Sequence, residues 1–407
     1  MRDRALRVLA ECERIATMTE EPGRITRRFL TPPTHEVHAH LRGRMESLGM
    51  SVHLDNAGNL RGLSHPDGAS DKRLILGSHI DTVPDAGAFD GVLGVMLALE
   101  CVDLLRQNGL PLAIEVIAFS EEEGVRFGVP FLGSRAVAGR FDPGLLALKD
   151  AEGVTLEGAI RAYGLDPARI SESAIDEAAL GFVEIHIEQG PVLEAENLSV
   201  AAVTGIVGQT RLTLELAGQA NHAGTTPMNL RRDALTGAAE WISAVEKLAK
   251  HTEGLVATVG KIEASPNATN VVAGTVVMTL DARHPHDAIR LGSVNALLET
   301  ANAITDRRSL AMQCTPQMDQ PAVSMDERLT AYMVDAMEAS GFPRKQMHSG
   351  AGHDAMVMAS RMPSAMLFLR SPGGISHNPA ESVRTEDVEA ALEVSLHFLK
   401  RLAAEVG

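Results

Sequence analysis

Two short apolar runs in the first third of the chain have the length expected of buried strands. They cover residues 74–77 and 113–119, and each leads into a polar cluster. Between them, residues 91–106 carry apolar side chains at the spacing of one helix face. This order predicts a βαβ unit, in which loops at the carboxyl ends of parallel strands converge over a rigid sheet.

Two later segments predict further strands with polar residues at or near their ends. Residues 182–188 alternate strictly, which places Val183, Ile185 and Ile187 on a buried face and His186 on the opposite face. The apolar run 365–369 is a second strand, and His377 follows it. We therefore expect four strand ends to deliver polar side chains.

The pattern changes after residue 208. The expected elements there are a strand (210–217), a helix (232–250), two strands (255–262 and 271–282), a helix (287–305) and a strand (310–315). This βαββαβ order predicts a ferredoxin-like domain at residues 209–322. It would be inserted into a larger α/β catalytic domain formed by residues 1–208 and 323–407.

Histidines and carboxylates gather at the predicted strand ends. They are His79, Asp81 and Asp90 around the first strand, Glu121, Glu122 and Glu123 after the second, His186 in the third and His377 after the fourth. Each has an ordinary explanation alone, because loop histidines are commonly solvated or hydrogen-bonded and glutamates favour helix N-termini. Together they offer the imidazole and carboxylate ligands that a pair of divalent cations requires. The pattern favours a metal site and a hydrolase.

Composition limits the number of domains, the partners and the cellular location that we expect. A chain of 407 residues, 45% of them hydrophobic, is expected to form two domains. Its formal net charge of −16 argues against nucleic acid and anionic membranes as partners. The three cysteines, Cys12, Cys101 and Cys314, form no paired motif, and the N-terminus does not read as a signal peptide. No stretch is long and apolar enough for a membrane span, so we expect a cytoplasmic protein.

Eight ordered motifs resemble those of dinuclear-metal amidohydrolases that cleave ureido groups. That family comprises allantoate amidohydrolase, N-carbamoyl-L-amino acid hydrolase and β-ureidopropionase, within the clan of aminoacylases and di-zinc exopeptidases. The motifs are GSHIDTV, DAGAFDGVLGV, EEEGVRF, EIHIEQGPVLE, NHAGTTPM, NVVAG, SGAGHDAM and GISHNPAE. The resemblance implies an exopeptidase-like α/β catalytic domain with the inserted domain as a lid and dimerisation domain.

The resemblance also implies a ligand set. Asp90 would bridge two metal ions, with His79 and His186 completing one site and Glu123 and His377 the other. Glu122 would be the general base and Asp81 the carboxylate that fixes the tautomer of His79. Ligands without thiolate suit Mn²⁺ or Zn²⁺, with Co²⁺ or Ni²⁺ as alternatives.

The substrate-binding residues implied by the resemblance lie in both domains. Arg283 would bind a substrate carboxylate, Asn270 and Gln189 would hold the ligand, and His222 would polarise the scissile carbonyl. An ion pair with a neighbouring aspartate is the alternative for Arg283. His353 would either contact the substrate or orient a neighbouring side chain.

In this family His222 reaches an active site across a dimer interface, so the resemblance predicts a homodimer with composite sites. The expected reaction is hydrolysis of a linear ureido C–N bond in a small anionic substrate. Allantoate is favoured, giving ureidoglycine (ureidoglycolate), ammonia and CO₂. N-carbamoyl-L-amino acids and N-carbamoyl-β-alanine are alternatives, followed by a dipeptidase or aminoacylase and by an inactive binding protein. His186 followed by Glu188-Gln189-Gly190 weighs against a peptidase.

Overall fold

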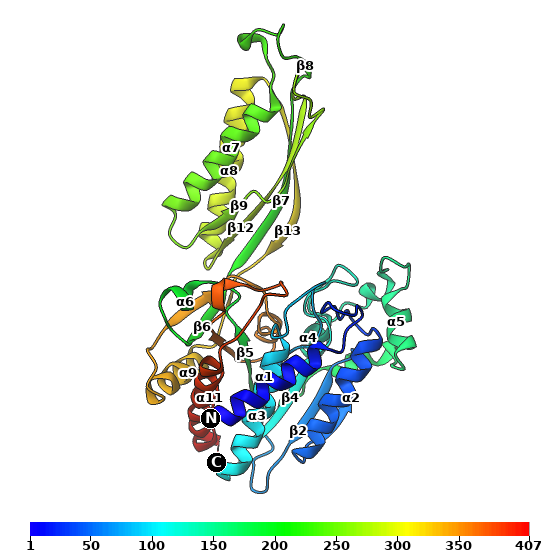
Figure 1. The fold of residues 1–407 in the computed structure, drawn as a ribbon, viewed down its shortest axis with the longest axis vertical. Helices are drawn as coiled ribbons and strands as arrows, with labels where there is room; N and C mark the ends of the chain where they lie inside the picture. Colours follow the sequence, from blue (N-terminus) through cyan, green and yellow to red (C-terminus); the bar gives the residue numbers. More distant parts are fainter. Residues whose placement is uncertain (407) are drawn as a thin grey trace. The chain divides into compact units, whose positions relative to one another are not determined.

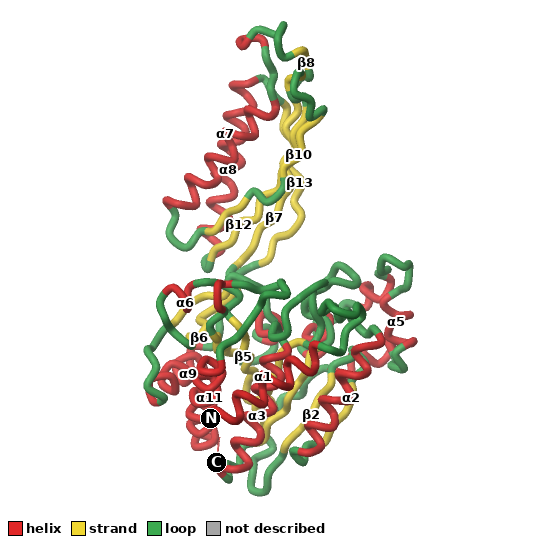
Figure 2. Tube along the Cα trace, in the orientation of Figure 1, coloured by secondary structure: helices red, strands yellow, loops and turns green. Residues whose placement is uncertain are grey.

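A computed structural model describes residues 1–406, and the chain divides into two units. The first consists of Met1–Thr204 together with the part from Ser324 onward, and the second is Gly205–Val323. Each unit has its own hydrophobic core. Each also has its own β-sheet structure, as Figures 1 and 2 show. Among the described residues, no helix combines the length and the apolar character needed to cross a membrane.

The first unit is built on a nine-stranded mixed sheet. Its strands are β1 (Ser51–Leu54), β2 (Leu60–Ser64), β3 (Arg73–His79), β4 (Ala113–Phe119), β5 (Ala179–Ile187), β6 (Val200–Ile206), β14 (Val323–Ser324), β15 (Gln346–Ser349) and β16 (Ser364–Leu369). The order is β1-β2-β4-β3-β5-β16-β6-β14, with β15 paired to β6. The four central strands, β4, β3, β5 and β16, are mutually parallel, so their carboxyl ends meet at one edge.

Helices cover this sheet. They are α1 (Arg2–Ala16), α2 (Pro32–Ser47), α3 (Val92–Asn108), α4 (Leu132–Val137), α5 (Leu156–Ala162), α6 (Val192–Ala195), α9 (Glu327–Ala339), α10 (Asp354–Met358) and α11 (Thr385–Val406). Short 3-10 helices span Pro143–Ala147, Pro167–Ser173 and Pro372–Gly374. The apolar stripe predicted for residues 91–106 forms α3, which ends at Gly109 in a left-handed cap. Helix α3 is buried on nearly every side because β3, β4, β5, α1 and α11 surround it.

The strand β5 shows how the fold buries polar residues. Val183, Ile185 and Ile187 join the core that contains α3, as the alternation predicts. The opposite face is also covered, since Glu184 is fully buried and accepts a hydrogen bond from the main-chain N–H of Ala355 at the start of α10. Both faces of a central parallel strand are therefore dry, and His186 is buried with Glu184.

The second unit contains the predicted βαββαβ elements with two strands broken. Its elements are β7 (Gly208–Ala217), β8 (Asn221–His222), a 3-10 helix (Met228–Leu230), α7 (Ala234–His251), β9 (Val256–Thr258), β10 (Ile262–Ser265), β11 (Val271–Val272), β12 (Thr275–His284), α8 (Asp287–Arg308) and β13 (Ala311–Gln320). The strand expected at 255–262 is interrupted around Gly260, because glycine lacks a side chain to pack on the sheet. The strand expected at 271–282 divides into β11 and β12.

An antiparallel sheet with two helices on one face makes up most of the second unit. The order is β10-β12-β7-β13, with β9 paired to β12, and α7 and α8 lie side by side on the sheet (Figure 1). Trp241 of α7 is fully buried and donates its indole N–H to the main-chain oxygen of Leu297 in α8 at 2.8 Å. This contact joins the two helices above the sheet core.

Candidate metal centre

The carboxyl ends of the four parallel strands bring the predicted ligands together. His79 is the last residue of β3, and His186 is the penultimate residue of β5. Glu122 and Glu123 follow β4, and His377 lies in the loop after β16. Asp90 comes from the loop that precedes α3. These segments are far apart in sequence, and the parallel pairing of their strands is what places them at one edge.

Asp90 lies between two groups of ligand atoms. Its Oδ1 is 3.3 Å from Nε2 of His186 and 3.6 Å from Nε2 of His79. Its Oδ2 is 3.3 Å from Nε2 of His377, which is itself 3.4 Å from Oε1 of Glu123. Within each group the ligand atoms lie within 4.8 Å of one another. The two carboxylate oxygens of Asp90 thus face two different ligand groups, the arrangement a bridging carboxylate needs.

The tautomers of the two buried histidines fit a cation. Nδ1 of His79 lies 3.0 Å from the main-chain oxygen of Asp81, and Nδ1 of His186 lies 2.9 Å from that of Ile187. A carbonyl oxygen only accepts, so Nδ1 donates in each ring and a neutral ring has its lone pair on Nε2. Both lone pairs face the Asp90 carboxylate. Nε2 of His186 is buried without a hydrogen-bond partner among the described residues, and a cation would satisfy it.

The pKa values of the carboxyl groups at this edge of the sheet are strongly shifted. Burial and the neighbouring Glu123 and Asp354 raise the pKa of Glu122 well above its usual range, although His79 opposes them. Burial and Asp90 raise the pKa of Glu123 to about 7. Burial would raise the pKa of Asp90, but the three histidines outweigh it and hold that pKa well below its usual range. So many buried carboxyl groups require compensating positive charge, which protons or metal ions supply.

Asp81 orients the residues around it through two different groups. Its carboxylate accepts hydrogen bonds from the main-chain N–H groups of Glu122, at 2.9 Å, and Glu123, at 3.0 Å. The main-chain oxygen of Asp81 is closer to Nδ1 of His79 than its carboxylate, which is 3.5 Å away. The expected carboxylate contact with His79 is therefore secondary. The carboxylate mainly fixes the backbone that carries Glu122 and Glu123.

Two residues predicted to bind substrate also lie at this edge. Gln189, with φ of +57°, directs its side-chain amide at both oxygens of Asp90, at 3.2 and 3.1 Å. His353 is buried, bonded through Nε2 to Ser349 Oγ at 2.9 Å, and its ring packs edge-on against that of His186 at 4.5 Å between centroids. Burial lowers the pKa of His353 well below its usual value. This position favours the alternative in which His353 orients a neighbour.

The substrate-binding candidates of the second unit lie in two different sheets, because His222 belongs to the two-stranded sheet of β8 and β11 and Arg283 to the larger sheet. His222 pairs with Val271, next to Asn270, whose main-chain oxygen accepts the N–H of Ala223. Arg283 pairs with Gln209, near the start of the unit. From Thr275 to Arg283 there are eight residue steps along β12, or about 27 Å at 3.4 Å per residue. The structure does not bring Arg283 together with His222 and Asn270 inside this unit.

The contacts of His222 and Arg283 define what each can offer. Nδ1 of the exposed His222 accepts the N–H groups of Gly224 and Thr225 at 3.0 and 3.2 Å, so Nε2 carries the proton of the neutral ring. His222 can therefore donate a hydrogen bond to a carbonyl oxygen. Arg283 forms a two-point ion pair with Asp281, at 2.8 and 3.0 Å, as in the alternative given for it.

Sequence reasoning missed two residues that contact the ligands. Glu184 lies with His186 and His353 in a buried group of possible ligand atoms, and its Oε1 accepts the hydroxyl of Ser78 at 2.8 Å. Glu381 accepts the main-chain N–H of Asp90 at 3.1 Å. A signal was present for each, since Glu184 alternates with His186 and Glu381 lies four residues after His377.

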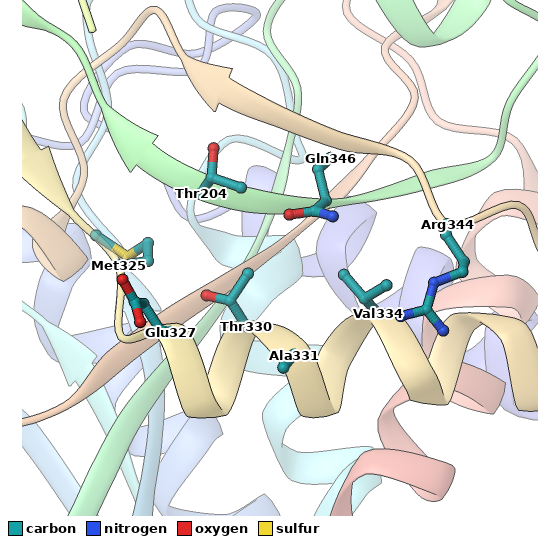
Figure 3. Close-up of a pocket in the computed structure, with 8 residues that line it drawn as sticks. All are labelled: Thr204, Met325, Glu327, Thr330, Ala331, Val334, Arg344 and Gln346. Atoms are coloured by element: carbon teal, nitrogen blue, oxygen red, sulfur yellow. The ribbon is translucent and has the colours of Figure 1, made fainter. Parts of the chain in front are cut away.

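A separate pocket of about 260 Å³ lies in the first unit, between α9 and the strands β6 and β15 (Figure 3). It is lined by Thr204, Met325, Glu327, Thr330, Ala331, Val334, Arg344 and Gln346. Arg344 is already paired with Asp335 at 3.0 Å. None of the described lining residues is a candidate ligand, so this pocket is not the predicted site.

Comparison with known proteins identifies the family. Residues 75–401 match Peptidase family M20/M25/M40, and the chain belongs to this family. An allantoate deiminase from Arabidopsis thaliana is 37% identical, covering 98% of this chain and 82% of the relative. An N-carbamoyl-L-amino acid amidohydrolase from Geobacillus stearothermophilus is 36% identical, covering 94% of each. A crystal structure of a hydantoinase/carbamoylase family amidase from Burkholderia multivorans has a TM-score of 0.93 at 32% identity, covering 99% of this chain and 98% of that one.

These findings confirm the resemblance drawn from the motifs and the α/β fold class. They also confirm the predicted enzyme class, because the relatives are named an allantoate deiminase and an N-carbamoyl-L-amino acid amidohydrolase. The family depends on two metal ions, and the ligand groups around Asp90 fit that requirement.

Proposed function

We propose that the chain hydrolyses a linear ureido C–N bond, with allantoate as its substrate. The observation that carries this proposal is the pair of ligand groups that share Asp90, with Glu122 beside them. Relatives named for allantoate and for N-carbamoyl amino acids, similar over nearly the whole chain, supply the substrate class. An inactive binding protein is disfavoured because the general base and all five ligands are present.

The metal ions of the proposal would be Mn²⁺ or Zn²⁺, with Co²⁺ or Ni²⁺ as alternatives. His79 and His186 would hold one ion, Glu123 and His377 the other, and Asp90 both. When bound, such ions lower the pKa of a coordinated water and polarise a carbonyl oxygen. The buried Nε2 of His186, which makes no hydrogen bond to a described residue and faces Asp90 Oδ1 at 3.3 Å, supports this assignment.

Glu122 would move the protons of the reaction. Its carboxylate oxygen lies within 4.8 Å of ligand atoms of both His79 and Glu123, next to the space that the ions would occupy. It would take a proton from the attacking water and give it to the departing nitrogen, so that one C–O bond forms as one C–N bond breaks. The released carbamate would decompose to ammonia and CO₂.

The second unit would recognise the substrate. Arg283 would pair with the substrate carboxylate in place of Asp281, because its planar guanidinium matches a carboxylate at two points. The exposed Nε2–H of His222 would donate to the scissile carbonyl oxygen. Gln189, Asn270 and His353 complete the proposed set, with Gln189 and His353 acting at the metal centre.

A homodimer with composite sites is part of the proposal. His222 and Asn270 lie at one end of the second unit, and Arg283 lies at the end where the chain enters and leaves it. We assign the two ends to two different active sites, so that His222 and Asn270 serve the partner's. The residues 209–322 would then form the lid and dimerisation domain, and residues 1–208 with 323–407 the catalytic domain. A cytoplasmic location is supported by three free cysteines.

Ammonia release from several substrates tests the proposal. The purified enzyme, loaded with Mn²⁺ or Zn²⁺, would be assayed with allantoate, an N-carbamoyl-L-amino acid and N-carbamoyl-β-alanine under identical conditions. We expect the highest kcat/KM with allantoate. A preference for the N-carbamoyl-L-amino acid would select the second candidate, which a 36% identical relative favours. Turnover of dipeptides or N-acyl amino acids without ureido hydrolysis would refute the proposal.

A further inference from the structure

Glu381 connects the loop of Asp90 to the loop of His377. Its carboxylate is buried, with only 6% of the residue exposed. Oε1 accepts the main-chain N–H groups of Phe89, at 2.9 Å, and Asp90, at 3.1 Å. Oε2 accepts the hydroxyl of Ser376 at 3.1 Å. A single side chain thus contacts the backbone of the central ligand and the residue next to His377.

Ser376 extends this contact to Gln189. The side-chain amide of Gln189 donates to Ser376 Oγ at 3.1 Å and to both oxygens of Asp90. The hydroxyl of Ser376 can therefore accept from Gln189 while it donates to Glu381. Three segments that are remote in sequence meet in this network around Asp90.

The loop that precedes Asp90 packs closely against the side chain of Glu381. A Cβ atom on Gly87 would lie 2.3 Å from Cβ of Glu381, so only glycine allows the loop to approach this closely. On the other side of the network, His377 has a φ of +54°, a conformation that side-chain-bearing residues seldom adopt. A residue in that region needs its surroundings to hold it, and Ser376 is the neighbour that Glu381 holds.

We propose that Glu381, acting with Ser376, is a positioning residue that keeps Asp90 and His377 in register for metal binding. It fixes the main chain of Asp90 and, through Ser376, the loop that carries His377. Neither Glu381 nor Ser376 belongs to the ligand groups around Asp90. The activity readout of this proposal rests on the proposed function, but its metal-binding readout does not.

Two substitutions separate positioning from charge. Glu381→Asp keeps the negative charge but shortens the side chain by one methylene, so the carboxylate loses its reach to the two N–H groups. Glu381→Gln keeps the reach, because the amide oxygen can accept the same N–H groups and the hydroxyl of Ser376 can rotate to accept from the amide. If positioning is the role, Asp is the more damaging change. If negative charge is the role, Gln is.

The measurement is metal affinity, by titration of the metal-free full chain with Mn²⁺ and with Zn²⁺ in chelator-buffered solution. We expect two ions per wild-type chain, a loss of about 10–100-fold in affinity for at least one ion in Glu381→Asp, and a loss below about threefold in Glu381→Gln. Glu100→Asp is the matched control, because Glu100 is also buried but binds Arg4, Arg7 and Arg44. It should bind both ions as the wild type does.

The outcomes distinguish this proposal from the proposed function. Equal affinities in the Asp variant and the wild type, or a larger loss in Gln than in Asp, would overturn positioning by Glu381. If the Asp variant does not fold, Ser376→Ala decides. We expect its metal affinity to fall by about threefold or more, and an unchanged affinity would overturn the proposal. A wild type that binds two ions but hydrolyses no ureido compound would refute only the proposed function. A wild type that binds neither ion would refute both.

Discussion

The two units of this chain carry their candidate chemistry in opposite ways. In the first, His79 and His186 are 2% and 1% exposed and come from the ends of parallel strands. In the second, His222 and Asn270 are exposed, and they lie in and next to the small two-stranded sheet of β8 and β11. Packing within the first unit holds its candidate ligands other than the exposed His377, whereas the candidate groups of the second unit are open to solvent.

In the proposed function, this contrast separates catalysis from recognition. Buried ligands hold their geometry whether or not substrate is bound, and so the first unit can be tested through metal binding alone. The residues of the second unit should affect turnover and substrate affinity without changing metal affinity. A substitution in the second unit that lowered metal affinity would contradict this division of roles.

The largest effect is expected for Glu122→Gln, which removes the proton carrier but keeps the shape of the side chain. Because Glu122 is not one of the five proposed ligands, both ions should remain bound. Turnover should fall by about 10²–10⁴-fold, the usual contribution of a general acid or base. Steady-state rates and metal content per chain would be measured on the same sample. Normal turnover would exclude Glu122 as the general base. Loss of metal from the variant would indicate that Glu122 is a metal ligand.

We expect the exposed end of the second unit, which carries His222, to serve another subunit. Glu122→Gln and His222→Ala subunits should each be nearly inactive alone. In a composite site, mixing and reassembly would pair an intact Glu122 with an intact His222 in one of the two sites of each mixed dimer. Because half of the dimers are mixed, the activity should recover to roughly a quarter of the wild type.

Recovery requires exchange of subunits, so the control is a mixture of wild-type and Glu122→Gln chains labelled with two fluorophores. Energy transfer between the labels would establish exchange. Exchange without recovery of activity would mean that His222 acts within its own subunit, and a chain that remains monomeric and fully active would refute the composite site.

A moderate effect is expected for Arg283→Lys. A lysine keeps the charge but loses the planar two-point contact, and a charged hydrogen bond contributes about 1.5–3 kcal/mol, so kcat/KM should fall about 10–100-fold. The loss should appear only with substrates that carry a carboxylate. An analogue with a carboxamide in its place is the control, since wild type and variant should process it equally. An equal loss of kcat/KM with the carboxylate and the carboxamide substrates would mean that Arg283 does not bind the carboxylate and serves only in its ion pair with Asp281.

The sequence predicts well which polar residues of the first unit lie together, because strand ends are a local property. An apolar run followed by His79, or by Glu122 and Glu123, is visible within ten residues, and parallel strands must align their ends. The fold class followed from the same patterns. The sequence does not indicate which loops contact one another. Those contacts depend on the pairing of β5 with β16, about 180 residues away.

Non-local contacts account for the residues that were missed or placed differently. Its position four residues after His377 was a signal for Glu381 in the sequence, but its contact with Asp90 follows only from the packing of the two loops. His353 is a loop residue in sequence, but the ring of His186 and the strand β16 bury it. In the second unit, alternation along β12 places Arg283 and Asp281 on one face, but it cannot say whether a substrate displaces that ion pair.

The smallest effect concerns polar groups that are buried without chemistry. Thr330 in the first unit is 7% exposed, and its hydroxyl has no hydrogen-bond partner among the described residues. Thr210 in the second unit is similarly buried, but its hydroxyl accepts a hydrogen bond from Arg290. Replacing each by valine removes the hydroxyl and keeps the branched shape. The two changes should therefore have opposite signs.

We expect Thr330→Val to raise the free energy of unfolding by about 1 kcal/mol, because an unsatisfied buried hydroxyl is removed. Thr210→Val should lower it by about 1–3 kcal/mol, because Arg290 loses a partner in a buried position. Urea unfolding followed by circular dichroism would measure both, and neither should change metal affinity. A destabilising Thr330→Val would mean that its hydroxyl is satisfied by solvent. In that case the missing hydrogen bond at Nε2 of His186 among the described residues would be weaker evidence for a cation, since burial without a hydrogen bond would not by itself distinguish the metal centre.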